Sequence, residues 1–238
     1  GAIIVNNKMQ TSNKDIYALG DAVEVKNTIT GERNGIALAG PANRQARIVA
    51  NNINGIESSY EGFIGSSILK IFNYSLGIVG LSERACKNLD IPYKIMIISP
   101  YSHATYYPGA KMLTIKAIYN SKTSQILGAY VWGKSSVDKI TDILSVAIQN
   151  KMGAADISAL ELCYAPPYSS AKSPVNILGN AIENEMNELV DTIAVEELKN
   201  KENLYILDVR TIEEYNISHI EGAINIPLDE LRENSTLP

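Results

Sequence analysis

The spacing of hydrophobic positions changes along the chain, and each change indicates a different kind of structure. Between residues 60 and 180, apolar residues alternate or run together as strands do, in SILKIFNYSLGIVGLS, YKIMIIS, KMLTIKAIY and QILGAYVWG. NSKTSQ reads as the hairpin loop joining the last two. VDKITDILSVAIQNKM then has helical spacing, and Ser173-Pro174 predicts a further helix start because serine caps helices and proline suits their first turn. Strands followed by helices predict an α+β domain with an antiparallel sheet.

The two ends of the chain differ from this middle region. AIIV at 2–5 and IYALGD at 16–21 read as short strands, the second of them buried. ALAGPANRQARIVANNI predicts a helix that starts after Gly40-Pro41. From residue 192, TIAVEELKN, TIEEYN and LDELREN read as helices that alternate with the strands LYILDVR and AINIP. This alternation is typical of the opening of an α/β domain, so the predicted fold class combines α/β and α+β parts.

Composition excludes several classes of function. The 238 residues carry a formal net charge of -5 and show no basic tract, which argues against nucleic acid as a partner. The longest apolar runs are far shorter than the ~20 residues of a membrane span, and the first ten residues do not resemble a signal peptide. Two cysteines, Cys86 and Cys163, fit a reducing cytoplasm. No residues have the spacing of metal ligands, and no GxGxxG motif is present.

Charge also divides the chain. Residues 191–238 hold 11 acidic and 4 basic side chains, whereas the remainder is slightly basic. We therefore predict a boundary near residue 190. Together with the hydrophobic patterns, this gives four predicted segments: 1–58, 59–184, a linker at 185–191, and 192–238. The chain opens on a strand pattern and its last segment holds only two good strand patterns, so we expect a piece of a longer protein.

The stretch CYAPPYSSAKSPVN at 163–176 is the first candidate for chemistry. Tyr164 and Tyr168 flank Pro166-Pro167, which fix two φ angles and push the preceding residue toward extended geometry. A phenol held in this way loses little further entropy when it meets a ligand, and its ordinary pKa of ~10 keeps it a proton donor at neutral pH. The alternative is a packed loop anchor whose hydroxyl faces water.

Three longer motifs carry a resemblance to known families. IYALGDA at 16–22 and LAGPANRQARIVANNI resemble the flavin-contacting motifs of the two-dinucleotide-binding-domain flavoproteins, the pyridine nucleotide–disulfide oxidoreductases. HATYYPGA at 103–110 and the Tyr164 stretch resemble the dimerisation domain of coenzyme A-disulfide reductases and their NADH oxidase-like relatives. LYILDVRTIEEYNISHIEGAINIPLDEL at 204–231 resembles the first half of a rhodanese domain.

The resemblance implies that residues 1–58 are the C-terminal part of a Rossmann-like FAD-binding domain. Gly20 allows close approach of the backbone, and Asp21 accepts hydrogen bonds from a ribityl hydroxyl of FAD. Pro41 and Ala42 lie at the helix start that faces the flavin, where unpaired N–H groups stabilise negative charge. Residues 59–184 are then the dimerisation domain and residues 192–238 the N-terminal half of a rhodanese domain.

For the middle domain the resemblance implies a homodimer in which each subunit contributes to the partner's site. By motif position, Tyr106 and Tyr164 line the site of the partner, and Lys172 meets a coenzyme A phosphate. Tyr107 and Tyr168 are assigned structural roles. His103 is either a turn histidine or a proton shuttle, and His219 supports the rhodanese fold.

The implied activity is FAD-dependent reduction of coenzyme A disulfide or coenzyme A persulfide by NADH or NADPH, with a rhodanese domain that carries sulfur. Neither cysteine occupies the family's redox position, and Asp208 and Arg210 remain without a rhodanese nucleophile. We therefore expect these residues alone to be inactive, to bind FAD poorly, and to hold a half rhodanese that is disordered, packed on its neighbour or swapped. Two alternatives remain: an NADH oxidase or peroxidase acting on O₂ or H₂O₂, and a non-catalytic dimerisation module.

Overall fold

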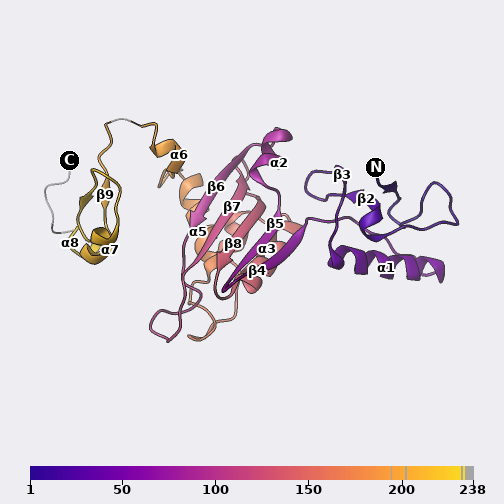
Figure 1. The fold of residues 1–238 in the computed structure, drawn as a ribbon, viewed down its shortest axis with the longest axis horizontal. Helices are drawn as coiled ribbons and strands as arrows, with labels where there is room; N and C mark the ends of the chain where they lie inside the picture. Colours follow the sequence, from indigo (N-terminus) through magenta and orange to yellow (C-terminus); the bar gives the residue numbers. More distant parts are fainter. Residues whose placement is uncertain (194, 202, 232, 234–238) are drawn as a thin grey trace. The chain divides into compact units, whose positions relative to one another are not determined.

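A computed structural model describes residues 1–193, 195–201, 203–231 and 233 (Figure 1). The chain forms two compact units, Gly1–Asp191 and Thr192–Pro238. Within the described residues, no helix is both long and apolar enough to cross a membrane. In the same residues, no group of three or more His, Cys, Asp or Glu side chains is arranged to hold a metal ion.

The first unit begins with a small three-stranded sheet. Strands β1 (Ile3–Ile4) and β2 (Val23–Lys26) pair in parallel, and β3 (Arg33–Gly35) pairs with β2 in antiparallel fashion. The predicted helix follows as α1 (Ala39–Ile53), but it starts at Ala39 and not after Gly40-Pro41, so that Pro41 lies in its first turn. A separate hydrophobic cluster lies here, formed by Val5, Met9, Val23, Val25, Ile48, Tyr60 and Phe63.

The predicted buried strand at 16–21 is wrong. Ile16 is 53% exposed, and Gly20–Ala22 forms a short 3-10 turn, η1. Gly20 has φ +74°, which a regular strand does not accommodate. The segment instead folds back on its own loop, where Ala18 N–H donates to the Met9 carbonyl at 3.1 Å. Backbone groups of this segment therefore form hydrogen bonds within the local hairpin and not with a neighbouring strand of the sheet.

The centre of the first unit is a five-stranded antiparallel sheet (Figure 1). Its spatial order, β4-β5-β8-β7-β6, differs from the chain order because β8 inserts between β5 and β7. The predicted hairpin loop between β7 and β8 is confirmed by its hydrogen-bonded turn, in which Ser124 N–H donates to the Asn120 carbonyl at 2.9 Å. The strands are β4 (Ser66–Ile71), β5 (Tyr74–Gly80), β6 (Tyr93–Ile98), β7 (Leu113–Asn120) and β8 (Ile126–Gly133).

Helices cover one face of this sheet. α3 (Val137–Gln149) packs on β5 and β8, and Gly77 permits this because a Cβ there would lie 1.9 Å from the Thr141 hydroxyl. α4 (Ala154–Ser158) and α5 (Pro174–Met186) complete the layer, and α2 (Glu83–Asn88) lies after β5. The main core between sheet and helices includes Ile115, Val131, Ile140, Leu144, Leu178 and Ile182, all at most 1% exposed.

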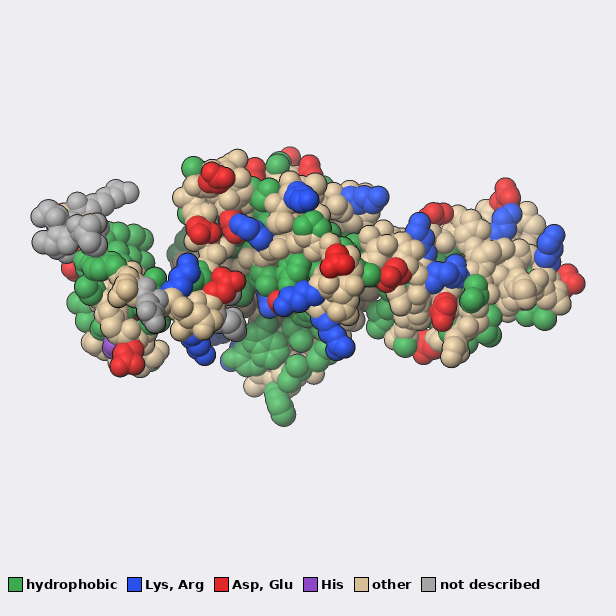
Figure 2. All heavy atoms as spheres, turned by 90° about the horizontal axis from the view of Figure 1, so that it is seen from above, with side chains coloured by type: hydrophobic (Ala, Val, Ile, Leu, Met, Phe, Trp, Pro, Cys, Tyr) green, Lys and Arg blue, Asp and Glu red, His purple; other side chains and the backbone are tan. Residues whose placement is uncertain are grey.

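The other face of the sheet presents apolar side chains outward. Register places Leu69, Leu76 and Trp132 opposite one another, and alternation puts them on the face away from Gly77 and α3. Tyr74 stacks on Trp132 with ring centroids 4.8 Å apart. Leu69 is 42% exposed, and Phe72 at the hairpin tip is 91% exposed. Figure 2 shows hydrophobic side chains at the surface of this sheet-containing part.

Helix α5 begins where the sequence predicts. Ser173 caps it, accepting a hydrogen bond from Asn176 N–H at 3.2 Å, and Pro174 is the first helical residue. The Asn176 side chain donates to three carbonyls, those of Ile157, Ser158 and Leu160. These bonds fix the start of α5 to the segment that leads into the Tyr164 loop. The helix ends at Met186, two residues into the predicted linker.

The second unit has short elements. Strands β9 (Leu207–Asp208) and β10 (Ile224–Asn225) pair in parallel, and both are shorter than predicted. Helix α7 (Ile212–Ile217) starts at a capping box between Thr211 and Glu214. Helices α6 (Val195–Leu198) and α8 (Leu228–Leu231) fall within predicted helices at 192–200 and 228–234, of which residues 194, 232 and 234 lie outside the described part.

Candidate functional site

Two loops meet at one end of the five-stranded sheet. The first runs from Ser99 to Met112 and is closed by Ser102 N–H, which donates to the Lys111 carbonyl at 2.8 Å. The second precedes α5 and contains the Tyr164 stretch. The loops are joined directly, because Ala104 N–H of the first donates to the Ser169 carbonyl of the second at 3.1 Å.

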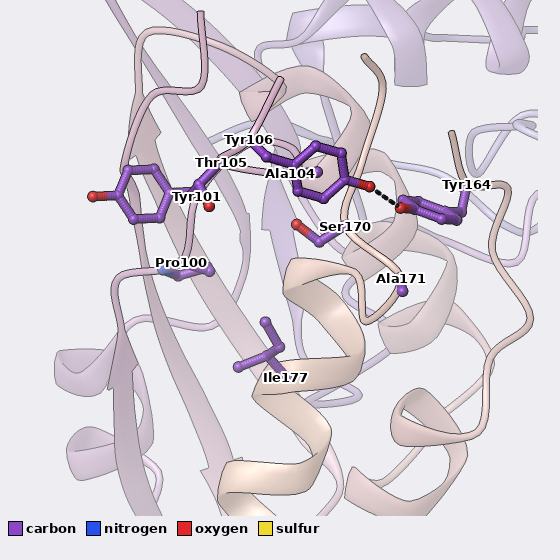
Figure 3. A pocket seen from close by; sticks show the side chains of 9 residues that line it. All are labelled: Pro100, Tyr101, Ala104, Thr105, Tyr106, Tyr164, Ser170, Ala171 and Ile177. Carbon is purple, nitrogen blue, oxygen red and sulfur yellow. Dashed lines mark hydrogen bonds between the residues drawn. The ribbon is translucent and has the colours of Figure 1, made fainter. Parts of the chain in front are cut away.

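Tyr106 and Tyr164, the two predicted catalytic residues, lie together. Their hydroxyl oxygens are 2.8 Å apart, although the residues are 58 positions apart in the chain (Figure 3). Tyr106 is 75% exposed and Tyr164 is 46% exposed. The hydrogen bond to Tyr106 is the largest cause that raises the pKa of Tyr164 above its ordinary value. Tyr164 therefore stays protonated at neutral pH, and a phenol O–H remains available for donation.

The proline pair has a clear local role. Ala165 accepts hydrogen bonds from Tyr168 N–H at 2.9 Å and Ser169 N–H at 3.2 Å, so Pro166 and Pro167 occupy the centre of a tight turn. Tyr164 comes directly before this turn, and Ser169 directly after it bonds to the other loop. The prolines thus restrict how far apart in space the Tyr164 phenol and the inter-loop contact at Ser169 can lie.

A mainly apolar pocket of about 420 Å³ opens beside the tyrosine pair. Figure 3 shows the two hydroxyl groups pointing at each other, with Ile177 of α5 lower in the view. A pocket of this size lies within the range of small-molecule binding sites. Its lining residues are Pro100, Tyr101, Ala104, Thr105, Tyr106, Tyr164, Ser170, Ala171 and Ile177.

The other residues predicted for this region lie around the pocket. Lys172 is exposed and directly follows the lining residue Ala171. Tyr168 is 70% exposed, which is a high exposure for a structural anchor. Tyr107 places its ring edge-on to the His103 ring, with centroids 6.0 Å apart. Lys172 therefore lies near the pocket but takes no part in the hydroxyl contact.

The predicted cofactor residues gather at the start of α1. Gly20 N–H donates to the Gln45 side-chain oxygen at 2.8 Å, and a Cβ at Gly20 would lie 3.9 Å from Ala42 Cβ. Asp21 follows in η1 with an exposed side chain. An acidic acceptor, a left-handed glycine and a helix N-terminus with Pro41 in its first turn thus lie side by side.

Gln45 gives this cluster an unsatisfied donor. The side chain is fully buried, and its Nε2 has no hydrogen-bond partner among the described residues. Gly20 N–H fixes the amide orientation, since it requires the oxygen to face it. A buried donor without an acceptor costs about 1–3 kcal/mol, which a bound polar group would remove. The residues present therefore fit a large polar cofactor such as FAD.

The remaining candidates are the two cysteines and the polar side chains of the second unit. Cys86 is fully buried, and burial is the main cause that raises its thiol pKa, whereas Cys163 is exposed. In the second unit, Arg210 bonds both carboxylate oxygens of Asp208, and its hydrogen bonds lower the pKa of that carboxyl. His219 stacks on Tyr215 with centroids 3.8 Å apart.

Comparison with known families defines the class of protein. Residues 66–174 match the family described as the pyridine nucleotide-disulphide oxidoreductase dimerisation domain. Residues 192–237 match the rhodanese-like domain. The chain thus carries a dimerisation domain of the pyridine nucleotide-disulphide oxidoreductase type and, after it, a rhodanese-like segment.

Three individual relatives are similar to this chain over most of its length. The chain is 37% identical over 180 residues to the coenzyme A disulfide reductase of Staphylococcus aureus strain bovine RF122 / ET3-1, covering 75% of this chain and 41% of that protein. It is 44% identical to reduced Bacillus anthracis CoADR-RHD, with a TM-score of 0.90, and covers 42% of that structure. The NAD-dependent persulfide reductase from A. fulgidus is 36% identical with a TM-score of 0.93, and 43% of it is covered. In each of these comparisons the chain matches the larger part of its own length but less than half of the relative.

A further solved relative is more distant. The water-forming NADH oxidase from Lactobacillus brevis is 27% identical over 80% of this chain and 42% of that protein, with a TM-score of 0.76. The confirmed points are therefore the family resemblance, the antiparallel sheet of the dimerisation domain and the rhodanese-like segment.

Sequence reasoning missed several residues of the two sites. Tyr101, Ser170 and Ile177 line the pocket without any motif that marks them. Gln45 offered a weak signal, because it lies one helical turn after Pro41 on the side that faces the Gly20 turn. Its signal in the sequence is that of a polar residue at a position that helical spacing assigns to the buried face.

Proposed function

We propose that the complete gene product is an FAD-dependent NAD(P)H oxidoreductase that reduces the sulfur–sulfur bond of a coenzyme A disulfide or persulfide. The observation that carries this proposal is the 2.8 Å contact between the hydroxyls of Tyr106 and Tyr164 beside an apolar pocket. The activities for which the relatives are named, coenzyme A disulfide reductase and persulfide reductase, support the same acceptor class.

The tyrosine pair suits this chemistry. Reduction of a sulfur–sulfur bond by two electrons breaks that bond and releases a thiolate. A phenol donates a proton to the leaving sulfur, or a hydrogen bond that stabilises it. Because one hydroxyl of the pair donates to the other, the second retains its O–H for the substrate. Tyr106 and Tyr164 act here as donors, and Lys172 attracts a phosphate group of coenzyme A as a point charge.

The cluster at α1 would hold the FAD. When bound, the flavin supplies electron transfer from NAD(P)H to a redox cysteine, which is neither Cys86 nor Cys163. Asp21 accepts hydrogen bonds from cofactor hydroxyls, and Gly20 lets the backbone approach. The N–H groups at the start of α1, beside Pro41 and Ala42, favour negative charge on the bound group.

The active form in this proposal is a homodimer in which the tyrosine pair serves the site of the partner. The high exposure of Tyr106 and Tyr164 supports this arrangement, since their own chain leaves both phenols accessible. The outward apolar face around Leu69, Leu76 and Trp132 offers surface for association. The rhodanese-like segment, with Asp208 and Arg210 in an orienting role, carries sulfur to or from the reductase.

An NADH oxidase that reduces O₂ is the second candidate, because the Lactobacillus brevis enzyme shares the fold at 27% identity. A non-catalytic dimerisation module is the third. All three share the sheet, so the acceptor has to be determined by experiment.

The test follows NADH oxidation by the complete gene product with coenzyme A disulfide, coenzyme A persulfide and O₂ as separate acceptors. We expect fast turnover with a coenzyme A acceptor, and a loss of at least about tenfold in Tyr164→Phe, or ~1.4 kcal/mol of barrier. Tyr168→Phe is the matched control on the same loop and retains full activity. The 238 residues alone should show no turnover with any acceptor.

Other outcomes identify the alternatives. Turnover with O₂ alone and a silent Tyr164→Phe would favour the oxidase and leave the loop as a packing device. An absence of turnover with every acceptor, in a protein that is folded and loaded with FAD, would favour the non-catalytic module.

A further inference from the structure

The position of Tyr106 depends on its backbone. The side chain is 75% exposed, and its one hydrogen bond recorded in the described structure goes to the Tyr164 hydroxyl. Packing therefore does little to aim this phenol. The loop that carries it spans eight residues, 103–110, between the paired residues Ser102 and Lys111. Any group that braces this loop internally controls where the hydroxyl lies.

His103 is such a group. The residue is only 9% exposed, and its ring spans the loop from base to tip. Nδ1 lies 3.1 Å from the Ser102 hydroxyl, and Nε2 lies 3.4 Å from the Pro108 carbonyl. Ser102 also accepts a hydrogen bond from Lys111 N–H at 3.2 Å, which joins the ring to the closing residue pair of the loop.

The partners select one tautomer of the neutral ring. A carbonyl oxygen only accepts, so the Pro108 carbonyl requires the proton on Nε2. Nδ1 then accepts from the Ser102 hydroxyl, whose oxygen accepts in turn from Lys111 N–H. The result is a chain of three hydrogen bonds with consistent direction, from Lys111 N–H through Ser102 and His103 to Pro108.

We propose that His103 is a positioning residue that braces the 103–110 loop and thereby holds the Tyr106 hydroxyl against Tyr164. The proposal rests on the function proposed above, in which the tyrosine pair donates to the substrate. His103 lies below the loop surface and touches no pocket-lining phenol in this network, so it acts through the backbone and not as a proton shuttle.

The first test needs neither cofactor nor turnover. In the 238-residue chain labelled with fluorotyrosine, ¹⁹F NMR follows the alkaline titration of Tyr164, assigned with Tyr164→Phe. The bond to Tyr106 raises the Tyr164 pKa, so Tyr106→Phe should lower it. His103→Leu should lower it equally, whereas His103→Gln, which retains an amide donor near the Nε2 position, should restore it. His219→Gln is the matched control and should leave it unchanged. An unaltered Tyr164 titration in His103→Leu overturns the proposal.

The second test uses activity in a double-variant cycle. His103→Leu should lower kcat by about tenfold, the order expected for a misplaced group, while KM changes less than about twofold. In a Tyr106→Phe background the same substitution should have little further effect, because the group that it positions is gone. Ser102→Ala, which removes the middle of the network, should show a smaller loss in the same direction, and it replaces His103→Leu if that variant does not fold.

The outcomes separate the two proposals. If Tyr106→Phe is itself silent, the donor function of the tyrosine pair fails, whatever His103 does. If Tyr106→Phe is impaired but His103→Leu is silent, or if their losses simply multiply, only the positioning role of His103 is overturned.

Discussion

The two compact units of the chain are held together by different means. In the first, side chains such as Ile115, Val131 and Leu144 are completely buried between sheet and helices. In the described part of the second, the buried hydrophobic side chains are Ala223 and Ile226, each 8% exposed. There, polar side chains bond to the backbone instead. The comparison indicates that a large apolar core lets the first unit carry exposed tyrosines on its loops, whereas the second uses polar groups to define its own fold.

The largest effect is expected when a core side chain of the first unit is truncated. Leu144→Ala removes a fully buried side chain of α3, so we expect the free energy of unfolding to fall by about 2–5 kcal/mol. Val146→Ala on the same helix is the control, because Val146 is 56% exposed and its loss should stay within about 0.5 kcal/mol. Urea unfolding measures both. Similar losses in the two variants would remove the basis for treating burial as the main stabilising term.

A smaller effect is expected for Asn225→Ala in the second unit. The Asn225 amide donates to the carbonyls of Asp208 and Arg210, both at 2.9 Å, and so ties β10 to the end of β9. We expect a local loss of about 1 kcal/mol, read as faster hydrogen exchange of the amides around β9 and β10. Asn216→Ala, at an exposed position of α7, is the control and should not accelerate exchange. Unchanged exchange in Asn225→Ala would show that polar bonds are not what holds this unit.

The ion pair of the second unit should give it a modest dependence on pH. Hydrogen bonds from Arg210 lower the pKa of Asp208 below its ordinary value of 3.8. A carboxyl with a depressed folded pKa stabilises the fold above the unfolded value and loses that contribution as pH falls through the folded value. In the unsubstituted protein, the protection of backbone amides in this unit against hydrogen exchange should therefore decline below about pH 3.8. Asp208→Asn should remove this part of the decline, and an identical acid profile would contradict the assignment.

The smallest effect concerns thiol labelling, which reports burial without perturbing the fold. Cys86 is fully buried, and burial followed by the charge of Glu83 raises its pKa, so its thiol should react only when the first unit unfolds. Cys163 is exposed and should react at once. One fast equivalent of labelled thiol is expected, and rapid labelling of Cys86 would mean that the α2 region opens readily.

Much of the fold could be predicted because hydrophobic periodicity reports burial directly. The five strands of the central sheet lie, to within a residue, in the four segments that apolar spacing indicates, and α3 and α5 start where apolar spacing, Ser173 and Pro174 indicate. The buried strand at 16–21 was wrong because Gly20 and a local hairpin redirected the backbone bonds. The spatial order of the strands depends on packing between distant segments, which periodicity does not encode.

The candidate site shows the same limit. Family motifs assigned Tyr106 and Tyr164 to one site, but the direct contact between their hydroxyls, 58 residues apart in the chain, follows only from the folded structure. The orientation of Gln45 toward Gly20 and the span of His103 across its loop are likewise tertiary features. Whether the tyrosines act as donors, and whether the predicted boundary between residues 58 and 59 separates two domains, both remain predictions.

The central claim is that the two phenols act as one donor unit. A cycle of Tyr106→Phe, Tyr164→Phe and the double variant in the complete gene product, assayed for NADH oxidation with a coenzyme A disulfide acceptor, tests it most directly. We expect each single variant to lose at least about tenfold in kcat, and the double variant to be no worse than the poorer single variant. Losses that multiply in the double variant, or single variants with full activity, would contradict the claim.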